Sequence, residues 1–260
     1  MSPAASPPQV RRAVGRAADL LRSARCAVAL TGAGLSTPSG IPDFRSAGSG
    51  LWERVDPMVV ASLTSFRYDP EAFFGFLRPL ASQILLALPN AAHQALARLE
   101  QAGRLMGVIT QNIDQLHQKA GSSKVLEVHG NVRRATCIVC YDEVDAGPYL
   151  DQFIRDGVVP HCPACGGVLK PNVILFGEQL PRAPFEEARA WCASCDVLLV
   201  AGSSLEVTPA SGLPQIALAA GARLIIVNRE PTYLDARADS VLHDDLVGVL
   251  PDLATEVLGG

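Results

Sequence analysis

The sequence has no excess of basic residues and no apolar run long enough to cross a membrane. Its 22 Lys and Arg residues are outnumbered by 26 Asp and Glu residues, which gives a formal net charge of -4. This mild acidity argues against a protein that binds nucleic acid by neutralising its phosphates. The longest apolar stretches, such as residues 196–201 and 224–227, fall well short of the roughly 20 residues that a bilayer requires. We therefore expect neither nucleic-acid binding nor membrane insertion.

The first residues lack the continuous apolar segment of a secretory signal. They read MSPAASPPQV, rich in Pro, Ser and Ala, and residues 1–8 are predicted to be a disordered lead-in. Without an export signal, the expected compartment is the cytoplasm. The seven cysteines are an odd number, and in such a compartment they favour metal binding over disulfides.

Four of the cysteines form two C-x-x-C pairs. They are Cys137 with Cys140 and Cys162 with Cys165. Each pair can lie on a tight turn, and two such turns supply four thiolates in a tetrahedron, which predicts Zn²⁺. Because four protein ligands close the coordination sphere, the metal is predicted to be structural.

Cys192 and Cys195 have the same spacing but a different context. They lie in an expected helix just before an apolar strand, where cysteines three residues apart share a buried face. We therefore predict that they are core residues and not metal ligands.

Near-continuous apolar runs alternate with helical patterns along most of the chain. The predicted strands are residues 26–30, 105–110, 196–202 and 223–228. The predicted helices are residues 90–101, 186–195 and 209–220. Runs of this kind are typical of strands covered on both faces, so the alternation predicts a parallel α/β sheet with right-handed crossovers.

Two segments interrupt this alternation. Residues 46–88 hold several aromatics compatible with helices, and residues 132–171 hold the cysteine pairs and a stretch rich in Pro and Gly. We predict a smaller lobe made of a helical insertion and a zinc-ribbon module. Residues 9–45, 89–131 and 172–260 are predicted to form the main domain.

A glycine-rich loop follows the first predicted strand. It reads Thr31-Gly32-Ala33-Gly34-Leu35-Ser36. A strand that ends in Gly-x-Gly is where backbone N–H groups meet a dinucleotide pyrophosphate, although it can also be a simple turn. The third glycine of the usual fingerprint is missing, and no acidic residue ends a second strand about 20 residues later. The loop therefore favours a dinucleotide and disfavours a hydride-transferring dehydrogenase.

Further motifs follow along the chain. They are GIPDFRS at residues 40–46, GLW at 50–52, TQNIDQLH at 110–117, EVHGN at 127–131, PNVILFGE at 171–178, GSSL at 202–205 and VN at 227–228. In order and spacing, these motifs resemble those of the sirtuins, a family of NAD-dependent protein-lysine deacylases. The resemblance covers nearly the whole chain from about Val10 onward. It implies a Rossmann-like domain, a small zinc-bearing lobe, and a cleft between them.

The resemblance also implies the reaction. NAD and an acyl-lysine side chain of a protein or peptide would enter the cleft from opposite ends. NAD would be consumed as a substrate, with nicotinamide expelled and the acyl group passed to ADP-ribose.

Three polar residues are the candidate catalytic groups. Asn112 and Asp114 offer an amide and a carboxylate suited to the ribose hydroxyls and the nicotinamide amide, and their alternative role is to cap a helix. His129 is the candidate general base, because an imidazole can take a proton from a ribose hydroxyl near neutral pH. The resemblance assigns these residues much the same roles.

By resemblance, the NAD contacts come from several loops. Phe44 could shield the sugar from water, and Arg45 could make a bidentate contact to phosphate, unless this is simply a surface loop with one buried aromatic. The full predicted set is Gly32, Ala33, Gly34, Ser36, Thr37, Asp43, Phe44, Arg45, Gln111, Asn112, Asp114, Gly202, Ser203, Ser204, Asn228 and Leu246, the last beside Asp245 in the adenine pocket.

The substrate contacts also follow from the resemblance. Ile174 and Phe176 would line an acyl-lysine tunnel. Gly177, Glu178 and Val207 would belong to edges that hold the peptide by β-augmentation.

The acyl group itself can be predicted from the helical insertion. One sirtuin branch recognises acidic acyl groups with a Tyr-x-x-Arg pair, where this chain offers Phe74 and Leu77, with Arg78 one position away. An apolar floor disfavours a charged acyl group. We predict deacetylation, with longer apolar acyl chains as an alternative.

Two rival functions stay open. A mono-ADP-ribosyltransferase shares the first half of the chemistry but transfers the sugar. A non-catalytic NAD-binding or zinc-ribbon module is the other, and the presence of both His129 and Asn112 argues against it. The sequence does not predict an oligomeric state.

Overall fold

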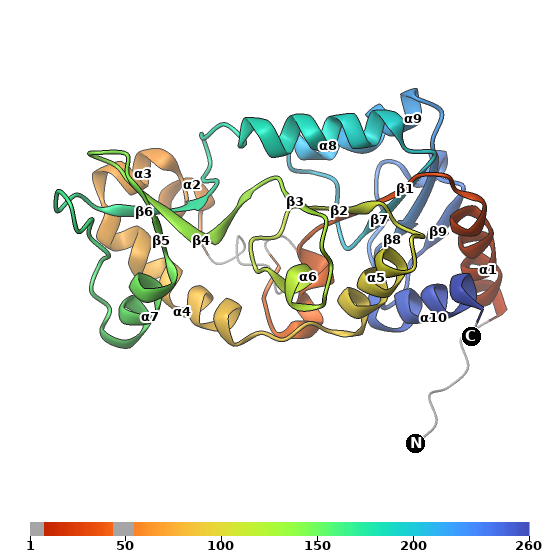
Figure 1. Cartoon of the computed structure of the whole chain (residues 1–260), viewed down its shortest axis with the longest axis horizontal. Helices are drawn as coiled ribbons and strands as arrows, with labels where there is room; N and C mark the ends of the chain where they lie inside the picture. Colours follow the sequence, from red (N-terminus) through yellow and green to blue (C-terminus); the bar gives the residue numbers. More distant parts are fainter. Residues whose placement is uncertain (1–7, 44–54, 260) are drawn as a thin grey trace, which may run out of the picture.

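The computed structural model describes residues 8–43 and 55–259. Phe44 and Arg45, both predicted to contact NAD, lie outside these residues. So does the predicted disordered segment except for Pro8, at which the first helix begins. The described chain forms a large parallel sheet and a small antiparallel sheet, each with its own helices (Figure 1).

The large sheet has six parallel strands in the order β3-β2-β1-β7-β8-β9. The strands are β1 Ala27–Thr31, β2 Gly107–Thr110, β3 Val125–Glu127, β7 Val197–Ala201, β8 Arg223–Val227 and β9 Ser240–Leu242. The four predicted strands are confirmed as β1, β2, β7 and β8. Of their residues only Arg223 is not buried, which explains why their sequences are apolar without alternation.

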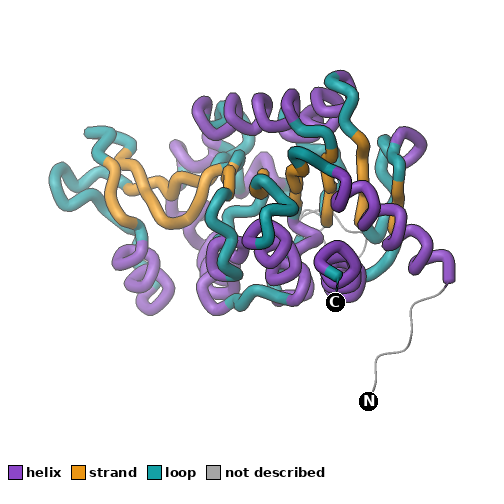
Figure 2. Tube along the Cα trace, turned by 45° about the vertical axis from the view of Figure 1, so that its right-hand side comes forward, coloured by secondary structure: helices purple, strands orange, loops and turns teal. Residues whose placement is uncertain are grey.

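Helices cover both faces of this sheet (Figure 2). On one face lie α1 Pro8–Ser23, α5 Ala91–Gln101 and α10 Leu246–Leu258, which share one hydrophobic core. On the other face lie α8 Arg182–Ser194 and α9 Leu213–Ala219, which share a second core. The three predicted helices are confirmed, although α8 begins earlier than predicted and a 3-10 turn, Ala210–Gly212, precedes α9.

The order of the strands places a crevice at the centre of the sheet. From β1, the chain builds β2 and β3 on one side and later returns to build β7, β8 and β9 on the other. The order therefore reverses between β1 and β7. In open α/β sheets, ligands bind outside the carboxyl ends of the strands at such a point.

The small sheet is antiparallel, in the order β5-β4-β6. Its strands are β4 Gly130–Cys137, β5 Glu143–Asp145 and β6 Leu169–Val173. The helices of this part are α2 Pro57–Val60, α3 Leu63–Tyr68, α4 Pro70–Leu86 and α7 Gly147–Asp156, and the short α6 Leu116–Lys119 follows β2.

A third hydrophobic core joins the helical segment to the cysteine-bearing segment. Phe74 on α4 meets Phe153 on α7 edge-on, with ring centroids 5.1 Å apart. The two predicted insertions therefore pack against each other. The predicted limits of the two domains stay a prediction.

None of the described helices is by itself long and apolar enough to span a membrane. Only α4 and α5 taken together pass on length and composition, and the chain bends by 57° between them.

Candidate active site

The glycine-rich loop lies at the central crevice, in direct contact with the loop that follows β7. The N–H of Gly34 donates to the carbonyl of Gly202 over 2.9 Å. A Cβ on Gly32 would lie 2.8 Å from that same carbonyl oxygen, and Gly202 has a φ of +65°. Only glycines allow the backbones of the two strand ends to approach so closely. The predicted dinucleotide loop therefore sits where the fold offers a binding site.

Asn112, Ser36 and Asp114 form one hydrogen-bonded group at the same edge of the sheet. The Asn112 amide donates to the carbonyl of Gly32 and to the Ser36 hydroxyl, both over 3.0 Å. The Ser36 hydroxyl donates to one oxygen of Asp114 over 2.6 Å. The other oxygen accepts the N–H of Leu116 over 2.8 Å, at the start of α6. Asp114 thus holds a helix start, its alternative role, and also lines the cavity at the crevice, while its role toward the ribose stays a prediction.

Burial shifts the pKa of Asp114. It raises the pKa of this carboxyl, while the Ser36 hydroxyl, the Leu116 N–H and the Lys119 charge act in the opposite direction. A carboxyl in such a dry position interacts strongly with any positive charge that develops nearby.

A buried polar layer lies behind this group and was not predicted from the sequence. The Thr31 hydroxyl donates to that of Thr110 over 2.9 Å and lies 2.9 Å from Nε2 of His117. The ring of His93 lies 5.1 Å from that of His117. Burial lowers the pKa of His93 to about 4, and burial with the His93 charge lowers that of His117 to about 3. Both rings are therefore neutral near pH 7.

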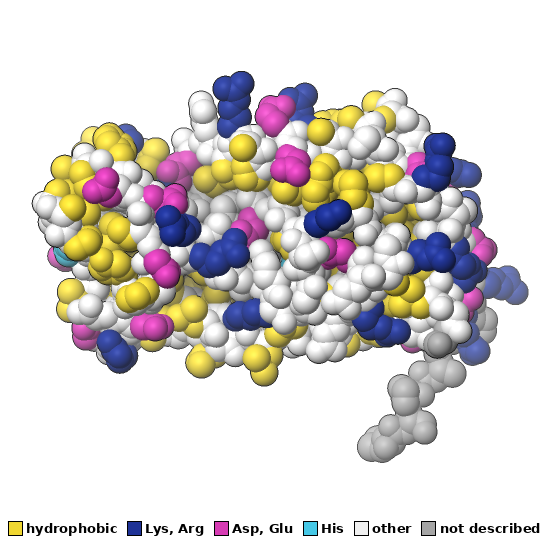
Figure 3. Space-filling view, in the orientation of Figure 1, with side chains coloured by type: hydrophobic (Ala, Val, Ile, Leu, Met, Phe, Trp, Pro, Cys, Tyr) yellow, Lys and Arg dark blue, Asp and Glu magenta, His cyan; other side chains and the backbone are white. Residues whose placement is uncertain are grey.

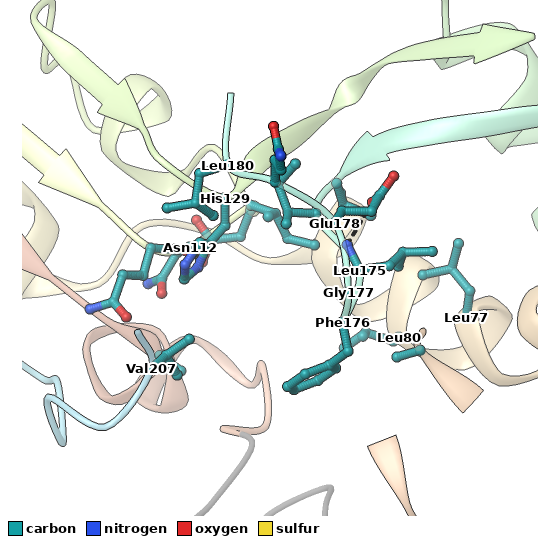
Figure 4. A pocket seen from close by; sticks show the side chains of 18 of the residues that line it. Leu77, Leu80, Asn112, His129, Leu175, Phe176, Gly177, Glu178, Leu180 and Val207 are labelled. Atoms are coloured by element: carbon teal, nitrogen blue, oxygen red, sulfur yellow. Dashed lines mark hydrogen bonds between the residues drawn. The ribbon is translucent and has the colours of Figure 1, made fainter. Parts of the chain in front are cut away.

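The ring of His129 is held in a defined orientation. Its Nδ1 lies 3.1 Å from the carbonyl oxygen of Gln111. Because a carbonyl oxygen only accepts hydrogen bonds, Nδ1 must carry the ring proton in the neutral form, which leaves Nε2 as the acceptor. His129 is half-buried and lines the same cavity as Asn112 (Figure 4). In this tautomer, Nε2 is the nitrogen that can accept a proton, as a general base requires.

The turn that carries His129 is braced from both ends. The Glu127 carboxylate accepts from the side-chain amides of Gln118 over 2.9 Å and Asn131 over 3.0 Å. Gly130 has a φ of +76°, and a Cβ there would overlap the carbonyl oxygen of Asn172 on β6. The EVHGN motif is therefore a tight fit between the two sheets.

A cavity of about 750 Å³ joins these polar groups to the small lobe. At one side lie Asn112 and His129, and at the other lie Leu77 and Leu80 of α4, with the segment from Leu175 between them (Figure 4). The predicted substrate residues Ile174, Phe176, Gly177, Glu178 and Val207 all line this cavity.

The prediction is wrong for one residue of the cavity floor, Phe74. Leu77 lines the cavity, but Phe74 is only 1% exposed and points into the core of the small lobe, where it meets Phe153. Phe73 and Phe76 line the cavity instead. The sequence pattern identified the helix but not which of its faces turns toward the cavity.

Arg78 points away from the cavity. Its guanidinium donates to the carbonyl of Ile154 over 3.1 and 2.8 Å and to that of Arg155 over 2.9 Å. These carbonyls belong to the last turn of α7, so Arg78 acts as a side-chain cap of that helix. This arginine is therefore unavailable to an acidic acyl group.

The loops after β7 and β8 hold further predicted NAD residues. Ser203 accepts a hydrogen bond from the Gln111 amide over 2.9 Å, and Ser204 contacts Glu206 over 3.3 Å. Asn228 follows β8, and its amide donates to the carbonyl of Glu230 over 2.7 Å. Each of these side chains lies at a carboxyl end of a sheet strand.

His243 is a further residue that was not predicted. Its Nδ1 lies 2.8 Å from the carbonyl oxygen of Asn228, and its Nε2 lies 3.0 Å from the carboxylate of Asp235. The two contacts tie the loop after β8 to the one after β9. The pairing could not be found from local patterns, because its members are far apart in the sequence.

Four other predicted NAD residues differ in their surroundings. Ala33 lines the cavity, and the Thr37 hydroxyl donates to the carbonyl of Gly34 over 2.9 Å. Asp43, the last described residue before residues 44–54, is half-buried. Leu246, the first residue of α10, is 6% exposed and packs into the core.

The two C-x-x-C pairs come together at the far end of the small lobe. The four sulfur atoms lie within 4.8 Å of one another. Cys137 and Cys165 are 3.4 Å apart and Cys140 and Cys162 are 3.6 Å apart. Four sulfurs around zinc at 2.3 Å are separated by about 3.8 Å, so the donor set fits a tetrahedral structural zinc ion.

The other cysteines do not join this cluster. Cys192 and Cys195 are buried in the core beneath α8, and burial raises the pKa of each thiol to about 12. The prediction that they are core residues is confirmed. His161 beside the knuckle contacts the carbonyl of Gly166 over 2.9 Å.

These features define an α/β protein that binds a dinucleotide, carries a structural zinc module and has the polar groups of an enzyme in a cavity between the two. The chain belongs to the Sir2 family, whose model matches residues 32–209. It is 44% identical over 245 residues to the NAD-dependent protein deacylase 2 of Archaeoglobus fulgidus, covering 94% of this chain and 96% of that one.

Solved structures of Sir2 enzymes have the same fold. One superposes with a TM-score of 0.91 at 43% identity, over 96% of this chain and 99% of the other. Another, a Sir2 complex with a p53 peptide and NAD⁺, has a TM-score of 0.83 at 39% identity, over 93% of this chain and 96% of the other. The predicted family is confirmed.

Proposed function

We propose that this protein is an NAD-dependent protein-lysine deacylase that passes the acyl group to ADP-ribose and releases nicotinamide. The observation that carries the proposal is one cavity with two unlike sides. Asn112, Asp114 and His129 supply its polar side at the dinucleotide crevice, and α4 supplies its apolar side. Such a cavity suits a sugar at one end and an acyl chain at the other. Relatives named as NAD-dependent deacylases support the same reaction.

In this proposal the polar residues act on the ribose that joins nicotinamide to the rest of NAD. Breaking that bond builds positive charge on the ribose, and the acyl oxygen attacks it. Asn112 and Asp114 orient the sugar and the departing amide. His129 then takes a proton from a ribose hydroxyl through Nε2, so that the hydroxyl oxygen can attack the acyl carbon. The bond between this carbon and the lysine nitrogen then breaks, lysine leaves as the free amine, and one water molecule is consumed to give the acylated ADP-ribose.

The remaining contacts are proposed from their places in the fold. The loop of Gly32, Ala33 and Gly34 would hold the pyrophosphate through its N–H groups. The residues proposed to complete the NAD site are Ser36, Thr37, Asp43, Phe44, Arg45, Gln111, Gly202, Ser203, Ser204, Asn228 and Leu246. Ile174 and Phe176 would line the acyl-lysine tunnel, and the backbones near Gly177 and Val207 would hold the peptide on either side.

The zinc module takes no part in the chemistry of this proposal. Cys137, Cys140, Cys162 and Cys165 would hold the ion in a closed coordination sphere, which leaves no position for a substrate. Its contribution is to the order of the small lobe. We also propose the cytoplasm as the compartment and the predicted division into domains as that of the folded chain.

The test is mass spectrometry of an acetyl-lysine peptide incubated with and without NAD. The parent should remove the acetyl group only with NAD, and His129→Ala should lose at least about 100-fold in rate, a typical contribution of a general base. Binding of NAD should be retained in that variant. His161→Ala is the control, because the His161 side chain is exposed and its Nδ1 contacts the knuckle carbonyl of Gly166, outside the cavity. Equal turnover in the parent and His129→Ala would remove the assignment.

A further inference from the structure

The turn over residues 175–178 follows β6 and lies along the cavity. All four of its residues line the cavity. Gly177 lies at its apex with a φ of +84°, and no hydrogen bond among the described residues engages the N–H or C=O of Gly177. These two groups are therefore available to the backbone of a peptide.

One flank of this turn is fixed by the segment before α3. The N–H of Phe176 donates to the carbonyl of Ala61 over 2.9 Å, and the N–H of Leu63 donates to the carbonyl of Phe176 over 2.9 Å. The backbone of Phe176 is thereby occupied, which leaves Gly177 as the open position.

The other flank is fixed by an ion pair that faces inward. The ammonium of Lys170 lies 2.9 Å from the Glu178 carboxylate, and their side chains are only 13% and 18% exposed. The same Glu178 oxygen accepts the N–H of Leu175 over 2.8 Å. Lys170 also donates to the carbonyls of Pro171 over 3.1 Å and Val173 over 2.9 Å. Glu178 therefore stabilises the turn and does not reach out toward a peptide.

Lys170 lies on β6, the strand that pairs with β4 next to the cysteine cluster. In β6 its neighbour Leu169 pairs with the metal ligand Cys137, and Lys170 itself pairs with Thr136. A short path of backbone pairs and one ion pair thus runs from the cysteine cluster to the cavity.

We propose that Lys170 is a positioning residue for the peptide substrate, acting through Glu178 on the turn that presents Gly177. This inference rests on the proposed deacylase function. It assigns to the zinc module a role in peptide binding, through a residue that touches neither NAD nor the acyl group. Lys170 is a charged group in a dry position, where burial lowers its pKa and the Glu178 carboxylate opposes that effect. If either partner is lost, the charged group of the other stays buried and unpaired.

The kinetic test compares Lys170→Met and Glu178→Gln with the parent on an acetyl-lysine peptide. Each variant should raise KM for the peptide about tenfold or more, because the pair is largely buried. The value of kcat should change less, and KM for NAD should stay within about twofold of the parent, since the proposed NAD loops belong to the other sheet. Lys170→Arg keeps the charge and should recover much of the peptide KM.

Arg134→Gln is the matched control. Arg134 pairs with Glu143 on the same small sheet, but both side chains are 48% exposed. Its loss should leave all three constants unchanged. If Lys170→Met raises both KM values alike, or if its constants match those of the parent, the assignment is wrong.

Amide hydrogen exchange keeps the test independent of turnover. In the zinc-loaded protein without substrate, Lys170→Met should speed exchange at residues 174–178 and leave that of β7 and β8 unchanged. Hydrogen exchange can be measured even if the parent protein does not deacylate the peptide. That failure would overturn the proposed function but not the role of Lys170 in the turn. Unchanged exchange at residues 174–178 would overturn the role of Lys170.

Discussion

Asn112, Asp114 and His129 are each held in place by hydrogen bonds to neighbouring groups. The carbonyl of Gln111 fixes the proton on Nδ1 of His129, and Ser36 joins Asn112 to Asp114. Holding catalytic groups in one geometry before the substrate arrives removes the cost of reorganisation during the reaction. The precision of the site thus depends on individual backbone positions nearby.

Among these backbone positions, Gly130 has the least room for a side chain. Gly130→Ala would place a Cβ against the carbonyl of Asn172, in a backbone conformation with φ of +76°. We expect the free energy of unfolding to fall by more than about 2 kcal/mol, measured by chemical denaturation.

Gly75→Ala is the matched control for this change. Gly75 lies within α4, its Cβ would meet open space, and its φ is ordinary. It should gain up to about 1 kcal/mol from helix propensity. Equal effects of the two substitutions would contradict the packing described for the EVHGN turn.

The acyl group can be predicted from two residues of α4. Leu77 lines the cavity, while Arg78 is engaged by the carbonyls at the end of α7. A succinyl carboxylate beside Leu77 would therefore find no cation on α4, and we expect kcat/KM at least about tenfold below that for an acetyl peptide. Competition between the two peptides, followed by mass spectrometry, gives this ratio directly. A preference for the succinyl peptide would show that another cation of the cavity lining, such as Arg182, pairs with the acyl carboxylate.

At the scale of elements, carboxylates hold the starts of the sheet strands. Asp196, just before β7, accepts the N–H groups of Arg25 and Cys26, each over 2.9 Å, where β1 begins. Partial burial raises the pKa of Asp196, but these N–H groups and the Arg25 guanidinium lower it further, so that it lies below its ordinary 3.8. The bonds therefore stabilise the fold while Asp196 is ionised.

Asp196→Asn should lose about 1 kcal/mol of unfolding free energy at pH 7, since an amide has one acceptor oxygen for two N–H groups. A lowered folded pKa means that this advantage of the parent is full above the unfolded pKa. It should disappear as the pH falls through the folded pKa, below 3.8. Denaturation from pH 3 to 7 measures it, with Asp19→Asn as an exposed control. A deficit that is constant across this range would refute the account.

Elements with strong local patterns could be predicted from the sequence, and those without could not. Apolar runs identify the strands β1, β2, β7 and β8. Asn90 identifies the start of α5, because its side chain caps the first N–H groups of that helix. Strands β3 and β9 have three residues each, too few for a pattern. Helix α10 contains Pro251, a residue that usually ends a helix.

The candidate site shows the same limit. Motif residues such as Asn112 and His129 could be placed because their neighbours in the sequence identify them. The pair of Lys170 and Glu178 depends on how the chain turns after β6, and the choice of Phe73 over Phe74 depends on the contact of Phe74 with Phe153 on α7. Such contacts follow from tertiary packing, which a local pattern does not contain.

The whole molecule consists of a large α/β part and a small lobe, with the cavity between them. On the face shown in Figure 3, charges of both signs are interspersed, in keeping with the mild net charge. The small lobe has one hydrophobic core of its own, and the cysteine cluster lies at its far end. The zinc ion should therefore matter most for the order of this lobe.

Cys140→Ala should lose the zinc ion, because three thiolates no longer close the tetrahedron. We expect metal analysis to fall from one zinc ion per chain to near zero, with a lower thermal midpoint. Cys26→Ala is the control, since Cys26 lies at the start of β1 outside the cluster. A Cys140→Ala protein that keeps its zinc would show that the cluster does not bind the metal as four ligands.

The fate of NAD separates a deacylase from both rival functions. Zinc-loaded protein is incubated with NAD and an acetyl-lysine peptide, and all products are quantified by mass spectrometry. The account predicts equal amounts of nicotinamide, acetylated ADP-ribose and deacetylated peptide. Intact NAD beside acyl peptides of every chain length, or ADP-ribose attached to protein in place of acetylated ADP-ribose, would contradict it.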